Sequence, residues 1–255
     1  MKIWLIRLVV VGGLLAVWEI GSGTLFDGYF VSRPSAIVEA FWELLTSGRL
    51  FYHAAITITE ALAGFVCGGL VGATTGVLLG RNEIIGKALD PIILVFYSLP
   101  KVALAPLFVI WFGIDIEMKI ILTATIVFFL VFLNTYTGVR GVSRELIAIM
   151  KLMGASEGHI LGKVVLPSVV TWIFTGLKLS VPYALIGAIV GELIAANRGL
   201  GYLLSNAAGQ FNTAGVFAAI VAIVILTILL NLAVRLFERR VMPWQTEQQT
   251  REISI

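Results

Sequence analysis

Charged side chains are scarce in this sequence: Asp, Glu, Lys and Arg make up 13% of its 255 residues, whereas hydrophobic residues make up 59%. An ordinary soluble domain carries roughly 25% charged residues. A soluble fold of this length, including an enzyme with large buried helices, would need more polar surface than these charges supply. The composition, with a mean hydropathy of +1.00, therefore predicts an integral membrane protein that lies in a lipid bilayer.

Cysteine and histidine are almost absent, since Cys67, His53 and His159 are the full set. One cysteine cannot form a disulfide within the chain, and two histidines so far apart match no metal-ligand spacing. The chain also lacks a G-x-x-x-x-G-K-[ST] phosphate loop, a nucleophile–base pair and a paired-carboxylate arrangement. We therefore expect no metal, no cofactor, no nucleic-acid partner and no enzymatic activity, and any ATP would be hydrolysed on a separate chain.

Long apolar segments are what the sequence has in abundance. A membrane span needs about 20 mostly apolar residues, and the segments that meet this requirement are 3–21, 57–80, 91–112, 119–139, 168–195 and 214–236. They predict an all-α protein with six transmembrane helices. The first segment is interpreted as a retained span, because no small-residue cleavage site follows it cleanly. Prolines interrupt the third and fifth segments, and we expect kinks there, which a membrane bundle tolerates.

Basic residues at the segment ends predict the orientation of the chain. One set of ends carries Lys2, Arg7, Arg81, Lys87, Arg140, Arg144, Lys151, Lys163, Arg235, Arg239 and Arg240, and the other carries only Arg33, Arg49, Lys119 and Arg198. Because basic residues favour the cytoplasmic side, we expect both termini to be cytoplasmic in a multi-pass protein of the cell (inner or plasma) membrane. Residues 22–56 then face outward and include a short amphipathic helix that starts near Pro34 and ends near Gly48.

The chain is thereby divided into three parts. Residues 1–56 hold the first span and the amphipathic helix, residues 57–240 form the transmembrane core with a cytoplasmic loop at 140–167, and residues 241–255 form a cytoplasmic tail.

Glycines recur at every fourth position of the second candidate span, at Gly64, Gly68, Gly72, Gly76 and Gly80. This spacing places them near one face of a helix, where a neighbouring backbone can approach closely. The face is interpreted as a tight seam between two helices, and the pattern does not distinguish a fixed seam from one that moves during transport.

The cytoplasmic loop 140–167 has the caps of two short helices. Ser143 is placed to cap the first, Gly154 suits the left-handed position that ends it, and Ser156 is placed to cap the second. Pro167 marks the entry to the fifth span. The sequence thus predicts a helical hairpin that projects from the membrane and carries apolar side chains suited to a groove on a partner.

The spacing within this hairpin resembles a known motif. Gly154 is followed after nine residues by Val164, then after one residue by Leu166 and Pro167. This is similar to the cytoplasmic "EAA loop" of binding-protein-dependent ABC importer permeases. The glutamate slot of that motif is occupied here by Ala148, and Glu145, one helical turn earlier, is the candidate substitute. The resemblance implies an ATPase-coupling loop made of Glu145, Ala148, Gly154, Ala155, Val164, Leu166 and Pro167.

Two further stretches resemble the nitrate/sulfonate/taurine-type permeases: "SLPKVALAPLFVIWFGI" at 98–114, and "TGLKLSVPYALIGAIVGEL" at 175–193 followed by "NRGLGYLL". The resemblance implies the permease subunit of an ATP-driven importer. Its partners would be a second permease copy, cytoplasmic ABC ATPase subunits and an extracytoplasmic solute-binding protein. The implied substrate is nitrate, a sulfonate, taurine or a related small solute, with a thiamine-precursor pyrimidine or riboflavin as alternatives.

Three ionisable residues inside apolar segments are candidates for the translocation pathway. Lys101 and Lys178 are each expected roughly 15 Å deep, near the middle of the bilayer, where charges are costly and usually face water or a bundle interior. Glu192 is expected near the outer end of the fifth span. These residues do not obviously pair in the sequence, which argues against a secondary transporter, the alternative of a different class.

Overall fold

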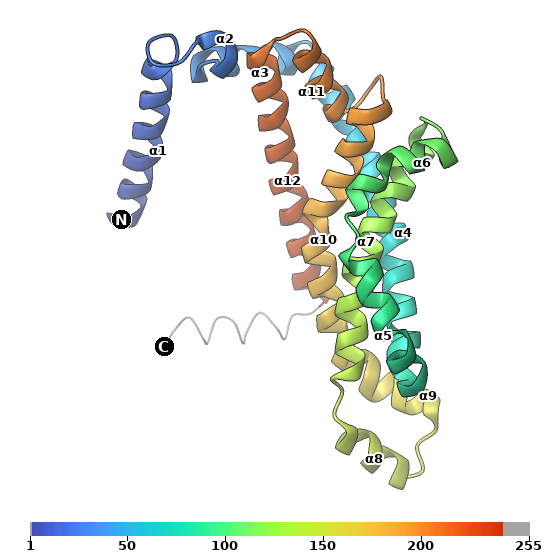
Figure 1. Cartoon of the computed structure of the whole chain (residues 1–255). Coiled ribbons are helices and arrows are strands. Elements are labelled where there is room, and N and C mark those ends of the chain that lie inside the picture. The colour runs from blue at the N-terminus through green and yellow to red at the C-terminus, as the bar shows by residue number, and fades with distance from the viewer. Residues whose placement is uncertain (1, 242–255) are drawn as a thin grey trace.

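The computed structural model describes residues 2–241, and every named element in that range is helical (Figure 1). The helices are α1 (Lys2–Gly21), α2 (Gly28–Val31), α3 (Pro34–Thr46), α4 (Arg49–Arg81), α5 (Glu83–Ser98), the 3-10 turn η1 (Lys101–Leu104), α6 (Ala105–Phe112), α7 (Ile116–Arg140), α8 (Arg144–Leu152), α9 (Glu157–Ile160), the π turn η2 (Leu161–Val165), α10 (Leu166–Ala195), α11 (Leu200–Gly209) and α12 (Thr213–Val241). The predicted all-α fold is confirmed. The predicted tail, from residue 242 on, lies outside the described residues.

Five of these helical stretches are long and apolar enough to cross a membrane, and α5 with η1 and α6 makes a sixth candidate that is bent by 75°. The third predicted span, 91–112, is thus broken just before Pro100, at one of the prolines where a kink was expected. Leu99 adopts an extended conformation, as expected for the residue before a proline, Pro100. The helix also begins earlier than predicted, at Glu83, because Asn82 caps it by accepting hydrogen bonds from the backbone N–H groups of Ile84 and Ile85.

The second span is longer than predicted, since α4 runs over 33 residues rather than from 57 to 80. At 1.5 Å per residue such a helix is about 50 Å long, which exceeds the roughly 30 Å hydrocarbon core. Its additional N-terminal turns bring His53, which is buried, into the helical bundle. The predicted amphipathic helix is α3, with Pro34 in its first turn, and Gly48 separates α3 from α4 in a left-handed conformation with φ 74°.

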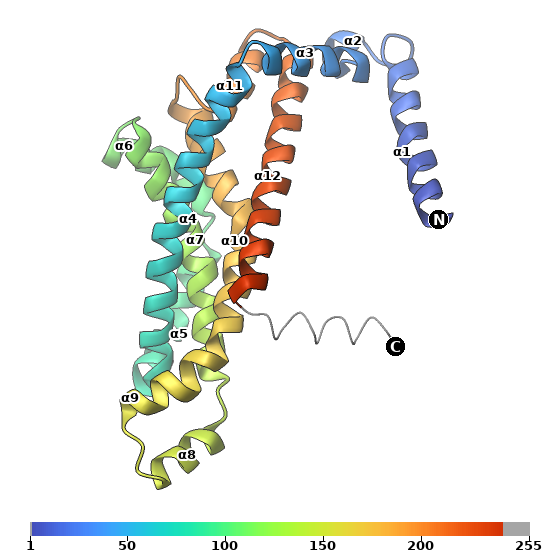
Figure 2. The ribbon, with the colours of Figure 1, turned by 180° about the vertical axis from the view of Figure 1, so that it is seen from behind.

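Helix α7 is the centre of the bundle, packed between α4 and α10 (Figures 1 and 2). Its side chains at Met118, Leu122, Val127 and Val131 are fully buried. The five glycines of α4 all face α7, so close that a Cβ at Gly72 would lie 2.7 Å from the Phe128 carbonyl oxygen. The seam predicted from the glycine spacing is thus the contact of α4 with α7, where small residues let two backbones approach.

Helix α1 stands apart from this bundle (Figures 1 and 2). Its side chains are mostly exposed. It is linked to the rest of the chain near its C-terminal end, where the Glu19 carboxylate accepts hydrogen bonds from the backbone N–H and hydroxyl of Ser35, and the Trp18 ring contacts Phe217. The apolar surface of α1 is therefore left for lipid or for another subunit.

Candidate coupling hairpin and buried charges

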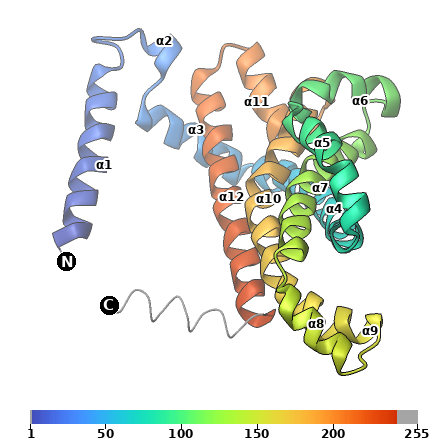
Figure 3. The ribbon, with the colours of Figure 1, turned by 60° about the horizontal axis from the view of Figure 1, so that its bottom comes forward.

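The hairpin, residues 144–160, projects beyond one end of the bundle, which we term the hairpin end; the opposite end, near α11, is the α11 end (Figures 1 and 3). Helix α8 begins as predicted, because the Ser143 hydroxyl accepts a hydrogen bond from the Leu146 N–H at 3.2 Å. The same hydroxyl donates to the Glu145 carboxylate at 2.6 Å. This bond holds the pKa of Glu145 below its ordinary value.

A glycine ends α8, as the sequence predicts. Gly154 has φ +79°, and the N–H groups of Gly154 and Ala155 donate to the carbonyls of Lys151 and Met150. This is the Schellman arrangement, in which a left-handed residue lets the chain reverse and satisfies the last helical carbonyls. The Gly154 conformation fixes the direction in which the chain leaves α8 within the hairpin.

The second predicted short helix is α9, but it does not end before the fifth span. Ser156 caps α9 by accepting a hydrogen bond from the His159 N–H, but α9 continues through the π turn into α10, and residues 157–195 form one helical stretch. Pro167 lies in the first turn of α10, directly after the π turn, which agrees with its expected place at the entry to the fifth span.

The two faces of the hairpin differ. Ile147 and Met150 pack inward on an apolar cluster that includes Val139, Ile160 and Val165. On the outer face, large apolar side chains lie exposed, namely Leu146, Ile149, Leu152 and Met153. Among the residues of the predicted coupling loop, Glu145, Ala148, Gly154, Leu166 and Pro167 are exposed, whereas Ala155 and Val164 are half-buried against the cluster.

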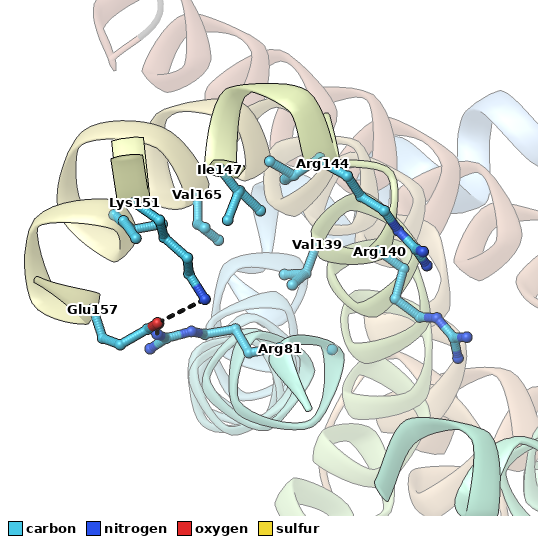
Figure 4. A pocket seen from close by; sticks show the side chains of 11 residues that line it. Arg81, Val139, Arg140, Arg144, Ile147, Lys151, Glu157 and Val165 are labelled. Carbon is cyan, nitrogen blue, oxygen red and sulfur yellow. Dashed lines mark hydrogen bonds and ion pairs between the residues drawn. The ribbon is translucent and has the colours of Figure 1, made fainter. Parts of the chain in front are cut away.

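A cavity of about 340 Å³ lies between the hairpin and the ends of α4 and α7. On one side of it, the Glu157 carboxylate pairs with Arg81 of α4 and Lys151 of α8, each at 3.1 Å (Figure 4). We call this set the hairpin ion pairs. Residues 81 and 157 are far apart in the sequence, so their contact could not be predicted from it. The sequence indicated only that Glu157 favours the N-terminal end of a helix.

The two candidate pathway lysines each have partners of their own. The Lys178 ammonium donates to the Glu238 carboxylate of α12 at 2.6 Å. Lys101 donates to the Tyr97 carbonyl and lies over the rings of Tyr97 and Phe129, 4.9 and 4.7 Å from their centroids. Lys178 is therefore paired with a carboxylate, which was not obvious in the sequence, whereas Lys101 contacts a backbone carbonyl and two rings.

Glu192 is buried near the α11 end, in a cluster that the sequence did not predict. Its Oε1 accepts a hydrogen bond from the Thr57 hydroxyl, and its Oε2 accepts one from the Gly201 N–H, both at 2.6 Å. Beside it, the Lys119 ammonium lies 3.3 Å from the Glu60 carboxylate. We call Glu60, Lys119 and Glu192 the buried charge cluster. Glu60 and Lys119 were visible in the sequence as isolated charges at the starts of two apolar segments, which was the available signal.

Comparison with known proteins identifies this architecture. The profile of the family described as binding-protein-dependent transport system inner membrane component matches residues 64–243. The chain belongs to this family. Its members are permeases, the membrane-spanning subunits of ATP-driven ABC importers, and family membership implies an ATPase and a solute-binding protein as partners. A secondary transporter is thereby excluded.

Curated relatives resemble the permease over nearly its whole length. The putative aliphatic sulfonates transport permease protein SsuC of Bacillus subtilis (strain 168) is 33% identical, covering 96% of this chain and 90% of the relative. The formylaminopyrimidine transport permease protein ThiX of Halalkalibacterium halodurans is 33% identical, covering 92% and 94%. The taurine transport system permease protein TauC of Escherichia coli (strain K12) is 32% identical, covering 93% and 90%.

A solved structure has the same fold. A chain of the MetNI methionine ABC transporter, in an inward-facing conformation, superposes with a TM-score of 0.58 at 21% identity, covering 82% of the permease and 97% of that chain. The predicted type I importer fold is confirmed by this likeness and by the family match.

Proposed function

We propose that the permease transmits the closing motion of cytoplasmic ATPase subunits through its hairpin. The observation that carries this proposal is the outer face of α8, which exposes Leu146, Ile149, Leu152 and Met153 beyond the end of the bundle. An amphipathic helix with such a face fits a hydrophobic groove on a partner. In this proposal the hairpin end and both termini are cytoplasmic, and the α11 end receives substrate from the solute-binding protein.

The connections of the hairpin supply the route for this motion. Helix α9 continues into α10, so a force on the hairpin acts directly on a helical stretch that reaches the α11 end. Glu157 also ties the hairpin to α4 through Arg81. Because α4 and α10 both pack on α7, a displacement of the hairpin would move the bundle rather than bend one loop.

We further propose that two copies of the permease assemble around one pathway. The exposed apolar length of α1, which stands apart from its own bundle (Figure 2), supports this arrangement because a second subunit can cover it. The two copies would alternate between access from outside and access from the cytoplasm.

An aliphatic sulfonate or taurine is the proposed substrate, since relatives named for these solutes match the permease over most of its length. The relative named for formylaminopyrimidine favours the second candidate, a thiamine-precursor pyrimidine. Lys101 and Lys178 are proposed to border the pathway. The charge of Lys178 is already matched by Glu238, so Lys101 is the better contact for an anion.

Reconstituted transport distinguishes these substrates. With the cognate ATPase and binding protein in proteoliposomes, we expect ATP-dependent uptake of taurine or an alkanesulfonate and none of formylaminopyrimidine. Lys101→Gln should reduce the uptake of the anion more than the matched change Lys178→Gln, with assembly of the complex unchanged in both. Uptake of the pyrimidine alone would replace the sulfonate proposal while leaving the permease function intact.

The coupling role is tested at Gly154. A leucine there is strained, because its left-handed conformation costs a residue with a Cβ about 1–2 kcal/mol, whereas asparagine tolerates this conformation. We expect Gly154→Leu to lose ATPase co-purification and substrate-stimulated ATP hydrolysis, while Gly154→Asn keeps both. Normal assembly and transport by a membrane-inserted Gly154→Leu variant would contradict the proposed role.

A further inference from the structure

The buried charge cluster joins three helices at the α11 end: Glu60 lies on α4, Lys119 on α7 and Glu192 on α10. All three residues are at most 3% exposed. Charges removed from water in this way are costly unless they are paired and hydrogen-bonded. The cluster has no part in the coupling role proposed for the hairpin. That role therefore does not explain how the buried charges are balanced.

Glu192 is held by hydrogen bonds on both of its oxygens. One accepts from the Thr57 hydroxyl and the other from the Gly201 N–H. The Thr57 oxygen in turn accepts from the Leu200 N–H at 2.9 Å and lies 3.2 Å from the His53 carbonyl oxygen, a second acceptor for its proton. Because each carboxyl oxygen has two acceptor positions, these bonds fix the place of the Glu192 carboxyl group in either protonation state.

Glu60 has a different environment. Lys119 lies against its Oε1, whereas its Oε2 has no hydrogen-bond donor among the described residues. Thr57, which hydrogen-bonds Glu192, lies three residues before Glu60 on the same face of α4. The two buried carboxyl groups therefore share one site with a single ammonium, and one added proton would balance their charges.

Neighbouring groups do not supply the missing positive charge. Lys119 alone balances one of the two carboxylates. His53 is buried beside Tyr202, and its Nδ1 accepts a hydrogen bond from the Gly199 N–H at 2.9 Å, which a doubly protonated ring cannot do. The remaining cations whose charges reach the cluster are on exposed positions, where water screens them, namely Arg198 near Glu60 and Arg49 near His53.

We propose that Glu60 and Glu192 form a buried proton-binding site, in which the two carboxyl groups share a single proton. With this proton bound, the two groups together carry one negative charge, which Lys119 balances. The proton also completes a network that fixes the turn between α10 and α11, because Gly199, Leu200 and Gly201 all donate their backbone N–H groups to His53, Thr57 and Glu192. Loss of the proton leaves two carboxylates facing one ammonium and loosens this turn.

Infrared spectroscopy of the full-length permease in lipid nanodiscs tests the site directly. We expect the wild type to show the carbonyl band of a protonated carboxylic acid at neutral pH, and to lose it when the pH is raised. Glu60→Gln and Glu192→Gln should each abolish the band. The matched control is Glu238→Gln, which should retain it, because Glu238 is a single carboxylate paired with Lys178 and needs no proton.

Thermal unfolding tests the site by a second route. A glutamine at position 60 or 192 leaves one carboxylate for Lys119, so the cluster no longer needs a proton. We expect both variants to flatten the loss of Tm that high pH causes in the wild type. Glu192→Gln also places an amide N–H against Thr57 or Gly201, and it should lower Tm at neutral pH more than Glu60→Gln.

The proposal is overturned if the wild type at neutral pH lacks the band, or if the band survives both substitutions. A loss of Tm at high pH that stays the same in both variants would also contradict it. The wild-type spectrum decides the existence of the site even if neither variant folds. It does so independently of transport, so a failure here leaves the proposed function unaffected.

Discussion

Two lysine–glutamate pairs at opposite ends of the bundle have nearly the same geometry and very different surroundings. Lys119 and Glu60 are 3.3 Å apart with side chains 4% and 1% exposed, whereas Lys151 and Glu157 are 3.1 Å apart with side chains 57% and 66% exposed. An exposed pair contributes little and is screened by salt. The two side chains of a buried pair stay in contact, because separating them leaves a charge without water. The α11 end is thus held firmly, while the hairpin end is tied in a way that allows movement.

The largest expected effect comes from breaking the buried pair. Lys119→Met leaves the acidic groups of the cluster without their ammonium, and we expect a loss of about 3–5 kcal/mol of stability. The matched change at the hairpin end, Lys151→Met, should have a small effect because water can solvate Glu157. Denaturant unfolding of the two variants in the same detergent measures the difference. Similar losses in both would show that burial does not separate the two pairs.

An intermediate effect is expected at the contact of α4 with α7, on which both ends of the bundle depend. Gly72→Leu introduces a side chain where even a Cβ would lie 2.7 Å from a carbonyl oxygen of α7, and we expect a loss of at least about 2 kcal/mol from overpacking. Gly162→Leu, at a helical glycine with open space around it, is the control. The Tm of the solubilised protein should fall clearly only for Gly72→Leu. An unchanged Tm would refute close packing of α4 on α7.

The smallest effect on stability is expected from Glu157→Gln, which removes both hairpin ion pairs. Tm should barely change, because the carboxylate is exposed. If the pairs carry motion from the hairpin to α4, the ratio of substrate transported to ATP hydrolysed should fall, and raising the salt concentration should reproduce part of that fall in the wild type. A ratio that is insensitive to both changes would assign the hairpin ion pairs no part in coupling.

The sequence by itself determined the features that depend on local chemistry. The caps at Ser143 and Ser156, the left-handed Gly154 and the glycine face of α4 follow from the residues at and near those positions, because caps and helix faces are set over one or two turns. The lengths of the apolar segments predicted the spans, because each segment is a continuous stretch of the sequence. The prolines also acted as expected, since the chain bends just before Pro100 and Pro167 lies in the first turn of α10; what local chemistry did not show is that α9 continues into α10.

Only the tertiary structure decided which side chains meet across the bundle. Thr57 and Glu192 are 135 residues apart and hydrogen-bonded, and Lys178 is neutralised by Glu238, 60 residues away. No periodicity in the sequence encodes such contacts, because they depend on the rotation and depth at which α4, α7, α10 and α12 pack against one another. The same packing determines which charged side chains are removed from water. It therefore also determines which of two similar ion pairs stays in contact and which can separate.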